Sequence, residues 1–399
     1  MLHAVVRPPS RLRPKPSAAT INGMTRIGIF GGGQLAQMLT QAASALGLAT
    51  AIFERTPDSP AGRLTQHEIV GAWNDPVALA RFAAACDLVT LENEFVDATI
   101  LAQLEAQGLP VYPTAATVSL VQDKLTQKET LAAAGLAVPA FRGVTSPAAV
   151  VQAGADLGWP LVLKARRNGY DGYGNATLHT PAEVPAAWQR LARGDGALLV
   201  EAWVPFVREL AVMVARGRDG VSRAYPVVET VQQQHICQLV RAPALLPPEE
   251  AAVATALSLK AVEAVHGIGI FGVELFELAD GRVLFNELAP RPHNSGHYTI
   301  EGCATSQFEN HLRAILGWPL GSVALRAPAV VMLNLLGRRT GPVRPADLRE
   351  ALAVQGAHFH LYGKREARVG RKLGHVTALG ATLAEAEAIA RQAADLVQL

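Results

Sequence analysis

The fold is decided by two runs of sequence, VELFE at residues 273–277 and LFNELAPRPHNSGH at residues 284–297. Each run opens as an apolar segment that contains a carboxylate, and the Asp280-Gly281 turn between them is a strong β-hairpin signal. We therefore expect Glu274 and Glu287 to lie side by side on neighbouring strands. Two carboxylates held this close repel each other unless a cation lies between them, and such oxygen ligands suit magnesium with a bound phosphate.

The chain changes character after the second strand. Residues 290–297 read PRPHNSGH, which places a cation, several hydrogen-bond donors and two prolines in eight positions. This composition predicts a loop that holds an anionic ligand.

Length and composition bound what the rest of the chain can be. The 399 residues predict two or three domains, and half of them are apolar, so large cores are available. The net charge of +2, without a concentrated basic block in the folded part, does not indicate a nucleic-acid partner. No apolar run approaches the roughly 18 residues that a membrane-spanning helix needs. The three cysteines are far apart and form no CxxC pair, which favours a reducing, cytoplasmic compartment and buried structural thiols.

Residues 1–23 stand apart from the folded chain. They hold four prolines and four basic residues and no apolar stretch of the secretory type. We interpret them as a disordered tail or as a start codon placed too early, with Met24 as the natural start. A transit peptide is the less favoured alternative.

The first folded segment has the pattern of a Rossmann-like domain that ends near residue 120. A strand at residues 26–30 runs into Gly31-Gly32-Gly33-Gln34 and an amphipathic helix, which predicts an anion-binding helix N-terminus. Glu54 ends the next predicted strand, at residues 49–53, and can bind a ribose hydroxyl, so an NAD site remains an alternative. Further strands are expected at residues 68–72, 88–91 and 110–113.

Acidic residues follow one of these strands directly. Glu92 and Glu94 come immediately after residues 88–91. Ligands of open α/β sheets collect at the carboxyl ends of strands, so we expect these acids to face a site. A solvated turn is the alternative.

The central segment carries a lysine beside a glycine-rich loop. Lys164 ends an apolar strand, and residues 166–175 then read RRNGYDGYGN before another strand at residues 176–180. Amides of such a loop can close over phosphates, although the chain has no P-loop motif. A long structureless hairpin loop is the alternative. The strand at residues 198–204 can present its backbone to an adenine edge, with Glu201 accepting from the exocyclic amine.

An antiparallel sheet and a smaller C-terminal module complete the chain. Alternating segments at residues 209–215, 221–228 and 235–241 predict the sheet, and a helix at residues 248–265 leads into the opening strand pair. In the module, six basic side chains fall in one segment: Lys364, Arg365, Arg368, Arg371, Lys372 and His375. They predict a clamp for a phosphate monoester, because Arg forks match phosphate oxygens. A solvated β-hairpin is the alternative.

Taken in order, these motifs resemble the ATP-grasp superfamily. The order is glycine turn, Lys-bearing strand, glycine-rich flap, Val-Glu-x-x-Val strand and two Glu-bearing strands. More narrowly, the chain resembles the 5-(carboxyamino)imidazole ribonucleotide synthase family over roughly residues 25 to 380. The specific stretches are GGGQL at 31–35, DKLTQK at 123–128, NGYDG at 168–172, NELAPR at 286–291, HNSGH at 293–297 and the basic segment at 364–375.

The resemblance implies an α/β and α+β architecture with three domains after the tail. These are a Rossmann-like pre-ATP-grasp domain at residues 24–120, an ATP-grasp domain of two subdomains at 121–320 and a small β-rich domain at 321–399. It also implies a reaction in purine biosynthesis. ATP phosphorylates bicarbonate to carboxyphosphate, and the carboxyl group is placed on the exocyclic amine of 5-aminoimidazole ribonucleotide. ADP and phosphate leave. A homodimer is expected.

Motif matching implies the site residues. Magnesium, as two ions, is assigned to Glu274 and Glu287. Catalytic roles are assigned to Asp171, Tyr170, His293, Lys364 and Glu92, with Asp171 as a candidate base for the substrate amine. The ribonucleotide is assigned to Gln34, Leu35, Glu92, Asn294, Ser295, Lys364, Arg371 and Lys372. ATP is assigned to Lys124, Lys164, Gly169, Tyr170, Asp171, Gly172, Tyr173, Gly174, Asn175, Glu201, Ala202, Trp203, Val204, Glu209, Gln232, Asn286 and Glu287.

Two positions depart from the family pattern, and several rival functions stay open. Tyr173 stands where the flap usually carries Lys or Arg, so Arg166 or Arg167 is a candidate substitute. Gln232 replaces a histidine, with His235 three residues on. The rivals are another ATP-grasp ligase (a formate-dependent glycinamide ribonucleotide transformylase or a biotin carboxylase), an NAD-dependent oxidoreductase and a non-catalytic nucleotide sensor.

Overall fold

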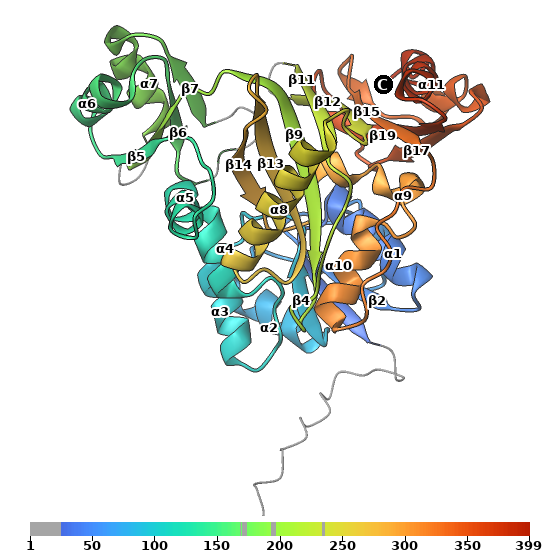
Figure 1. The fold of residues 1–399 in the computed structure, drawn as a ribbon. Coiled ribbons are helices and arrows are strands. Elements are labelled where there is room, and N and C mark those ends of the chain that lie inside the picture. Colours follow the sequence, from blue (N-terminus) through green and yellow to red (C-terminus); the bar gives the residue numbers. More distant parts are fainter. Residues whose placement is uncertain (1–24, 168, 170–173, 193–196, 234–235) are drawn as a thin grey trace, which may run out of the picture.

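The computed structural model describes residues 25–167, 169, 174–192, 197–233 and 236–399. Figure 1 shows an N-terminal α/β part below a central sheet, with a small lobe bearing α6 and α7 on one side and the C-terminal helix α11 on the other. The predictions for residues 1–23, for the flap residues Tyr170, Asp171, Gly172 and Tyr173, and for His235 lie outside the described residues.

The N-terminal part is a parallel sheet in the order β3-β2-β1-β4, as its strand-helix alternation predicts. The glycine turn follows β1, between its neighbours β2 and β4, where ligands of such sheets collect. The predicted strand at residues 110–113 is reduced to one bridge between Val111 and Val89, because the flanking prolines have no N–H for a ladder. The elements are β1 Arg26–Phe30, α1 Gln34–Ala45, β2 Ala49–Glu54, β3 Glu68–Val70, α2 Pro76–Ala84, β4 Leu88–Leu91, α3 Ala98–Ala106 and α4 Ala115–Gln122.

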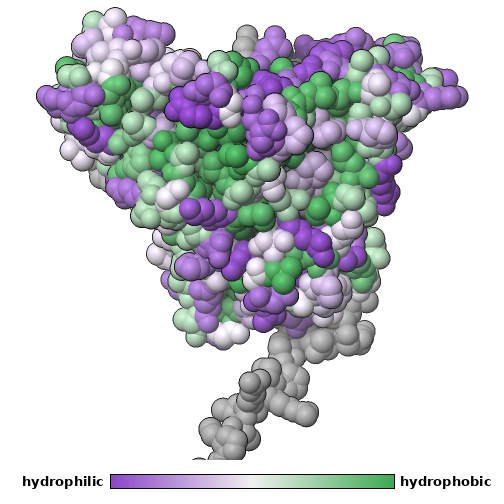
Figure 2. All heavy atoms as spheres, in the orientation of Figure 1, coloured by the Kyte–Doolittle hydropathy of each residue, from purple (hydrophilic) through white to green (hydrophobic). Residues whose placement is uncertain are grey.

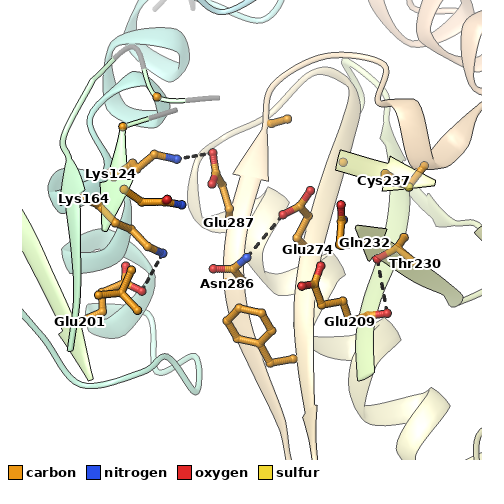
Figure 3. A pocket seen from close by; sticks show the side chains of 18 of the residues that line it. Lys124, Lys164, Glu201, Glu209, Thr230, Gln232, Cys237, Glu274, Asn286 and Glu287 are labelled. Atoms are coloured by element: carbon orange, nitrogen blue, oxygen red, sulfur yellow. Dashed lines mark hydrogen bonds and ion pairs between the residues drawn. The ribbon is translucent and has the colours of Figure 1, made fainter. Parts of the chain in front are cut away.

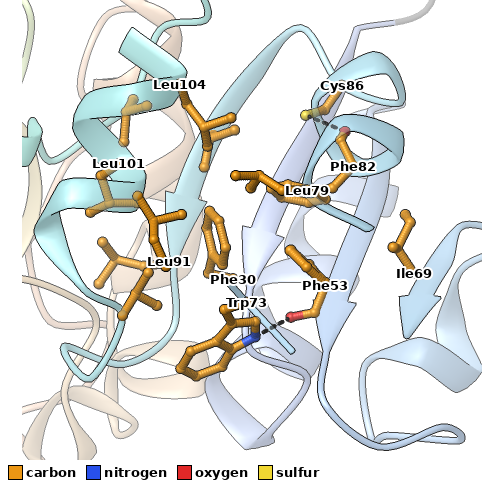
Figure 4. Close-up of a cluster of buried hydrophobic side chains, with 14 of the residues drawn as sticks. Phe30, Phe53, Ile69, Trp73, Leu79, Phe82, Cys86, Leu91, Leu101 and Leu104 are labelled. Carbon is orange, nitrogen blue, oxygen red and sulfur yellow. Dashed lines mark hydrogen bonds between the residues drawn. The ribbon is translucent and has the colours of Figure 1, made fainter. Parts of the chain in front are cut away.

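Aromatic side chains fill the core on one face of this sheet (Figure 4). Phe30 meets Phe82 edge to face with ring centroids 4.9 Å apart, and Phe53 lies 5.2 Å from the same ring. The Trp73 indole N–H donates to the Phe53 carbonyl at 3.1 Å, so its one polar atom is satisfied. This packing holds the ends of β1 and β2 beside the glycine turn.

A small antiparallel sheet in the order β5-β8-β6-β7 forms the lobe that carries Lys164. Its strands β6 and β7 are neighbours, so the glycine-rich segment at residues 166–174 joins two paired strands, as predicted. Helices α6 and α7 bury their apolar faces against this sheet. The elements are α5 Lys124–Ala133, β5 Phe141–Val144, α6 Pro147–Leu157, β6 Leu161–Ala165, β7 Asn175–Leu178, α7 Val184–Leu191 and β8 Leu198–Ala202.

The largest sheet has nine strands, eight of them in the order β14-β13-β9-β11-β12-β15-β19-β17, with β10 paired to β9. Its antiparallel first half confirms the predicted sheet, but the segment at residues 221–228 is broken, because Pro226 cannot donate to a ladder. The C-terminal strands extend this same sheet through the β12–β15 pairing. The strands are β9 Phe206–Arg216, β10 Ser222–Ala224, β11 Val228–Gln233, β12 Ile236–Ala242, β13 Gly269–Leu278, β14 Val283–Ala289, β15 Ala329–Leu336, β17 Ala357–Leu361 and β19 Lys372–Gly380.

Helices cover both ends of this sheet. Helix α8, Pro248–Ala264, buries Ala254, Ser258, Ala261 and Val262, which recur at helical spacing. Figure 2 shows hydrophobic residues gathered across the middle of the face on which α8 lies, with hydrophilic side chains along the upper edge. The other elements are α9 Thr299–Gly302, α10 Gln307–Leu316, α11 Leu383–Asp395 and the short pair β16 Gly341–Pro342 and β18 Glu366–Ala367. Within the described ranges, no helix is long and apolar enough to cross a bilayer.

Candidate active site

A cavity of roughly 340 Å³ opens between the small sheet and the β14-β13-β9 end of the large one. Figure 3 shows its two walls: Lys124, Lys164 and Glu201 on one side, and Glu209, Glu274 and Glu287 on the other. Lys124 reaches across the cavity to pair with Glu287, whereas Lys164 pairs with Glu201 on its own wall.

The paired strands place Glu274 directly opposite Glu287, as predicted. The register shifts next to this pair, because Glu274 pairs with Glu287 while Leu275 pairs with Phe285. Asn286 is thus the extra residue of a β-bulge, which re-aims side chains and breaks the strict alternation of a strand. Both Asn286 and Glu287 line the cavity, and the Asn286 amide donates to Glu274 at 3.4 Å.

The carboxylates on this wall repel one another. Burial, and then the negative charges of Glu287 and Glu209, hold the pKa of Glu274 well above its ordinary value. Burial also opposes ionisation of Glu287, but the ion pair with Lys124 outweighs it and lowers the pKa of Glu287. The negative charge that builds up around Glu274 is therefore not fully neutralised by nearby cations of the described residues.

This donor set fits magnesium carried by a phosphate ligand. The Asn286 side-chain oxygen is buried without a partner beside the two carboxylates. Among the described residues, no group of three or more His, Cys, Asp or Glu side chains is placed to hold a metal ion. Magnesium is usually bound through one or two carboxylates together with substrate phosphates and water, which is what this wall offers.

Glu201 is held between two lysines on the opposite wall. Its carboxylate lies 2.9 Å from the Lys164 ammonium and 3.1 Å from that of Lys128, and Glu201 and Lys128 are both almost fully buried. Burial raises the pKa of Glu201, but the two lysines outweigh it and hold the pKa below its ordinary value. Burial lowers the pKa of Lys128 to about 8. The two lysines hold the Glu201 carboxylate in place in the lining, and its contact with adenine stays a prediction.

Replacing Lys128 by methionine tests this arrangement. Glu201 would then pair with Lys164 alone and hold its charge away from a phosphate. We expect the KM for ATP to rise about tenfold, which is the scale of one charge-assisted hydrogen bond. Initial rates over a range of ATP concentrations measure it. Lys260→Met, at an exposed lysine of α8, is the control, and an unchanged KM in Lys128→Met would contradict the prediction.

Arg291 joins the N-terminal part to the strand pair. Its guanidinium forms a bidentate ion pair with Glu94, in which one N–O distance is 2.8 Å. Burial raises the pKa of Glu94, but the charge and hydrogen bonds of Arg291 outweigh this and lower it. Both residues line the cavity, so the prediction that an acid after β4 faces a site is confirmed for Glu94.

His293 lies on the same loop and faces Glu274. Its Nε2 atom is 3.5 Å from the Glu274 carboxylate, and its Nδ1 atom is 2.8 Å from the Ser295 hydroxyl. Burial, and then the positive charges of Arg291 and Lys372, lower the pKa of His293 to about 3. The imidazole is therefore neutral at neutral pH, and one ring nitrogen can donate a hydrogen bond while the other accepts one.

Comparison with known protein families covers nearly the whole chain. Residues 24–122 match the ribonucleotide synthetase preATP-grasp domain, residues 129–308 the ATP-grasp domain, and residues 330–389 the phosphoribosylaminoimidazole carboxylase C-terminal domain. An N5-carboxyaminoimidazole ribonucleotide synthase from Synechococcus elongatus is 43% identical over 90% of this chain and 91% of its own length. The chain belongs to the N5-carboxyaminoimidazole ribonucleotide synthase family.

Solved structures of this family agree with the fold. The synthase from Aspergillus clavatus in complex with ADP and 5-aminoimidazole ribonucleotide has a TM-score of 0.85 at 37% identity, over 94% of this chain and 98% of that one. The complex described with ATP has a TM-score of 0.86 over the same shares. The chain covers 66% of a longer Schizosaccharomyces pombe relative named phosphoribosylaminoimidazole carboxylase, to which it is 42% identical over 90% of its own length.

The amides of the glycine turn at residues 31–33 and of the start of α1 are already hydrogen-bonded to two carboxylates of the protein. Glu92 accepts from the amides of Gly33 and Ala36 at 3.0 and 3.2 Å, and Glu54 accepts from Gly32 at 2.8 Å. Burial raises the pKa of Glu92. The NAD alternative is therefore wrong, because the groups that would bind pyrophosphate and ribose bind each other. Glu92 thus holds the glycine turn, and its assigned roles in catalysis and ribonucleotide binding stay predictions.

The cavity collects most of the residues assigned to ATP and magnesium. Both predicted metal ligands and the described ATP residues line it: Lys124, Lys164, Gly169, Gly174, Asn175, Glu201, Ala202, Trp203, Val204, Glu209, Gln232, Glu274, Asn286 and Glu287. Their individual roles remain predictions. The suggested substitutes for the Tyr173 position, Arg166 and Arg167, both pair with Asp123.

The residues assigned to the ribonucleotide are divided. His293, Asn294, Ser295 and Lys372 line the cavity. The Leu35 side chain is 8% exposed within a hydrophobic cluster, and the assigned contact of this residue stays a prediction. Gln34, Glu92, Lys364 and Arg371 lie outside the described lining.

The basic segment at residues 364–375 matches the predicted phosphate clamp only in part. His375 is fully buried and stacks on His360 with ring centroids 4.6 Å apart, so its place among the phosphate-binding cations is corrected. The Lys364 ammonium donates to the Lys372 carbonyl at 2.6 Å, and Arg371 donates to the Glu366 carbonyl at 2.9 Å. His375 is buried because it pairs with His360 between neighbouring strands of the sheet. The sequence pattern alone counts it as one more cation.

Some lining residues had no assignment from sequence. Phe206 and Phe276 stack in parallel at 4.7 Å on the floor of the cavity. Phe276 follows Gly272 and Glu274 at the period of a strand, so alternation along β13 was a usable signal. The other unassigned lining residues are Val162, Thr177, Thr230, Cys237, Ala289 and Arg291.

Proposed function

We infer that this chain carboxylates 5-aminoimidazole ribonucleotide with bicarbonate, at the expense of ATP, in purine biosynthesis. The observation that carries the inference is the cavity in which Lys124 and Lys164 face Glu274 and Glu287, with the His293 loop at one side. The relatives of the family are named for this activity, and one is described with ADP and 5-aminoimidazole ribonucleotide.

The terminal phosphoryl group of ATP passes to a bicarbonate oxygen, which gives ADP and carboxyphosphate. The exocyclic amine of the ribonucleotide then forms a bond to the carboxyl carbon, either directly or after release of carbon dioxide. Phosphate leaves, and a base accepts the amine proton. Phosphoryl transfer needs positioning and charge neutralisation more than covalent help from the protein, and Lys124 and Lys164 would supply positive charge from one wall.

Magnesium would be held by Glu274 and Glu287, with Asn286 beside them. When bound, it would neutralise phosphate charge and orient the terminal phosphate. The stacked rings of Phe206 and Phe276 offer an apolar surface to a ligand bound in the cavity.

The ribonucleotide is proposed to bind where the glycine turn, the His293 loop and Lys372 converge. Lys372 lines the cavity and supplies positive charge for its phosphate, and Gln34, Lys364 and Arg371 are the proposed further contacts. The neutral His293 imidazole can orient the amine by a hydrogen bond at Nε2.

Omitting each substrate in turn tests the function. ADP release and carboxylated product are measured with ATP and magnesium, with bicarbonate and the ribonucleotide each left out. We expect product only in the complete mixture, and a large loss of ADP release without the ribonucleotide. Equal ADP release without the ribonucleotide, with no carboxylated product, would exclude this assignment and favour another ATP-grasp ligase.

Assembly, location and domain limits are proposed together. Exposed apolar side chains of the N-terminal part, Leu64, Val70, Val77 and Phe95, supply surface for a homodimer. Light scattering at micromolar concentration would reveal a monomer if this is wrong. A cytoplasmic location follows from the free cysteines, and domain boundaries near residues 120 and 320 accord with the matched family ranges.

A further inference from the structure

The loop that carries Arg291 and His293 is hydrogen-bonded at both ends to the side-chain amides of buried glutamines. At one end, the Gln127 amide on α5 accepts from the Leu288 N–H and donates to the Leu288 carbonyl, both at 3.1 Å. At the other end, Gln307, the first residue of α10, does the same to His293. Each side-chain amide thus pairs with one backbone residue as a neighbouring strand would.

The grip at Gln307 is the tighter of the two. Its Oε1 atom accepts from the His293 N–H at 3.0 Å, and its Nε2 atom donates to the His293 carbonyl at 2.8 Å. The same Nε2 atom lies 3.1 Å from His297 Nδ1. Gln307 is fully buried and lies outside the described residues that line the cavity, so it acts on substrates only through the loop.

Two glycines make this close contact possible. A Cβ atom added at Gly296 would lie 2.5 Å from the Gln307 side-chain oxygen, and one added at Gly272 would lie 2.5 Å from the His293 Cβ. The His293 loop is therefore pressed against β13 on one side and against Gln307 on the other. This close packing on both sides restricts the backbone of the loop to a single conformation.

We propose that Gln307 is a positioning residue for the carboxylation half of the reaction, which sets the His293 imidazole opposite Glu274. The 3.5 Å approach of His293 Nε2 to the Glu274 carboxylate and its 2.8 Å contact with the Ser295 hydroxyl both depend on where the His293 backbone lies. The residues proposed to contact ATP lie on elements that Gln307 does not bond, so we expect the binding of ATP to change much less than carboxylation. The inference rests on the proposed function.

Two variants of Gln307, Gln307→Glu and Gln307→Asn, test whether its hydrogen bonds to His293 matter apart from the space that its side chain fills. Glutamate keeps the size and the acceptor for the His293 N–H but cannot donate to its carbonyl. Asparagine keeps the amide but withdraws it by one methylene. We expect the rate of carboxylated product to fall about tenfold to a hundredfold in both, the scale set by a misplacement of about 1 Å. The KM for ATP should stay within about twofold, and the ratio of ADP to carboxylated product should rise.

Asn310→Asp is the matched control. Asn310 is a fully buried amide on the same helix, and it bonds Tyr225 and Gly321 away from the cavity. It should lower the melting temperature like the Gln307 variants while the ratio of ADP to product stays as in the wild type. An unchanged ratio in both Gln307 variants, or an equal rise in Asn310→Asp, would overturn the proposal. Failure of the proposed function is seen separately, as absence of carboxylated product from the wild-type enzyme.

Discussion

Glu287→Gln is expected to lower kcat on the order of 10³-fold while the protein stays folded. The substitution keeps the size of the side chain but removes the negative charge that faces Glu274 across the strand pair and that pairs with Lys124. Magnesium would lose one of its two carboxylates, and Lys124 would lose the partner that fixes its ammonium. Both changes act on the charge that must be held at the phosphates.

The measurement for Glu287→Gln is ADP release with all substrates present, together with circular dichroism. Asp280→Asn is the matched control, because it makes the same chemical change at the exposed turn of the same hairpin. We expect the control to turn over at the wild-type rate. A wild-type rate in Glu287→Gln would exclude the assigned role in holding magnesium.

Arg291→Met is expected to destabilise the protein by about 3 kcal/mol and to abolish carboxylation. Breaking this partly buried ion pair by removing one partner leaves an uncompensated charge, here the Glu94 carboxylate. Urea unfolding monitored by fluorescence measures the loss. The double variant Arg291→Met with Glu94→Leu should recover much of the stability but none of the activity, because it removes the orphaned charge without restoring the cation.

The same pair gives a pH dependence with a definite sign. The folded-state pKa of Glu94 lies below its ordinary value, so its contribution to stability is present above the unfolded pKa and is lost as pH falls through the folded pKa. Arg291→Met removes this contribution, so its stability should fall less steeply on acidification than that of the wild type. Parallel stability curves for the two proteins would contradict the role given to this pair.

Strand pairing and the order of motifs were readable from sequence because they depend on local periodicity and turn chemistry. The Asp280-Gly281 turn and the flanking apolar runs sufficed to set Glu274 opposite Glu287. The bulge at Asn286 was not readable, because an extra residue in one strand is decided by the match between two strands. Alternation alone would have pointed Asn286 and Glu287 to opposite faces.

The partners of the charged residues were decided by packing. Glu201 reads as a ligand for adenine in its own strand, yet Lys128, 73 positions earlier, reaches it from α5. Arg291 pairs with Glu94, which lies 197 positions earlier in the chain. Gln307 reaches the backbone of the His293 loop from helix α10. His375 looks like one cation among six in sequence, but its register within β19 buries it beside His360.

By itself, the sequence determined which residues this protein has for its chemistry and in what order they occur along strands and loops. That information suffices for the fold and for the family, because both follow from short-range pattern. Only the tertiary structure decided which of those groups face a ligand and which are neutralised by another side chain. The physical reason is that burial and charge pairing depend on contacts between distant elements, and a carboxylate such as Glu92 binds substrate or its own backbone according to those contacts alone.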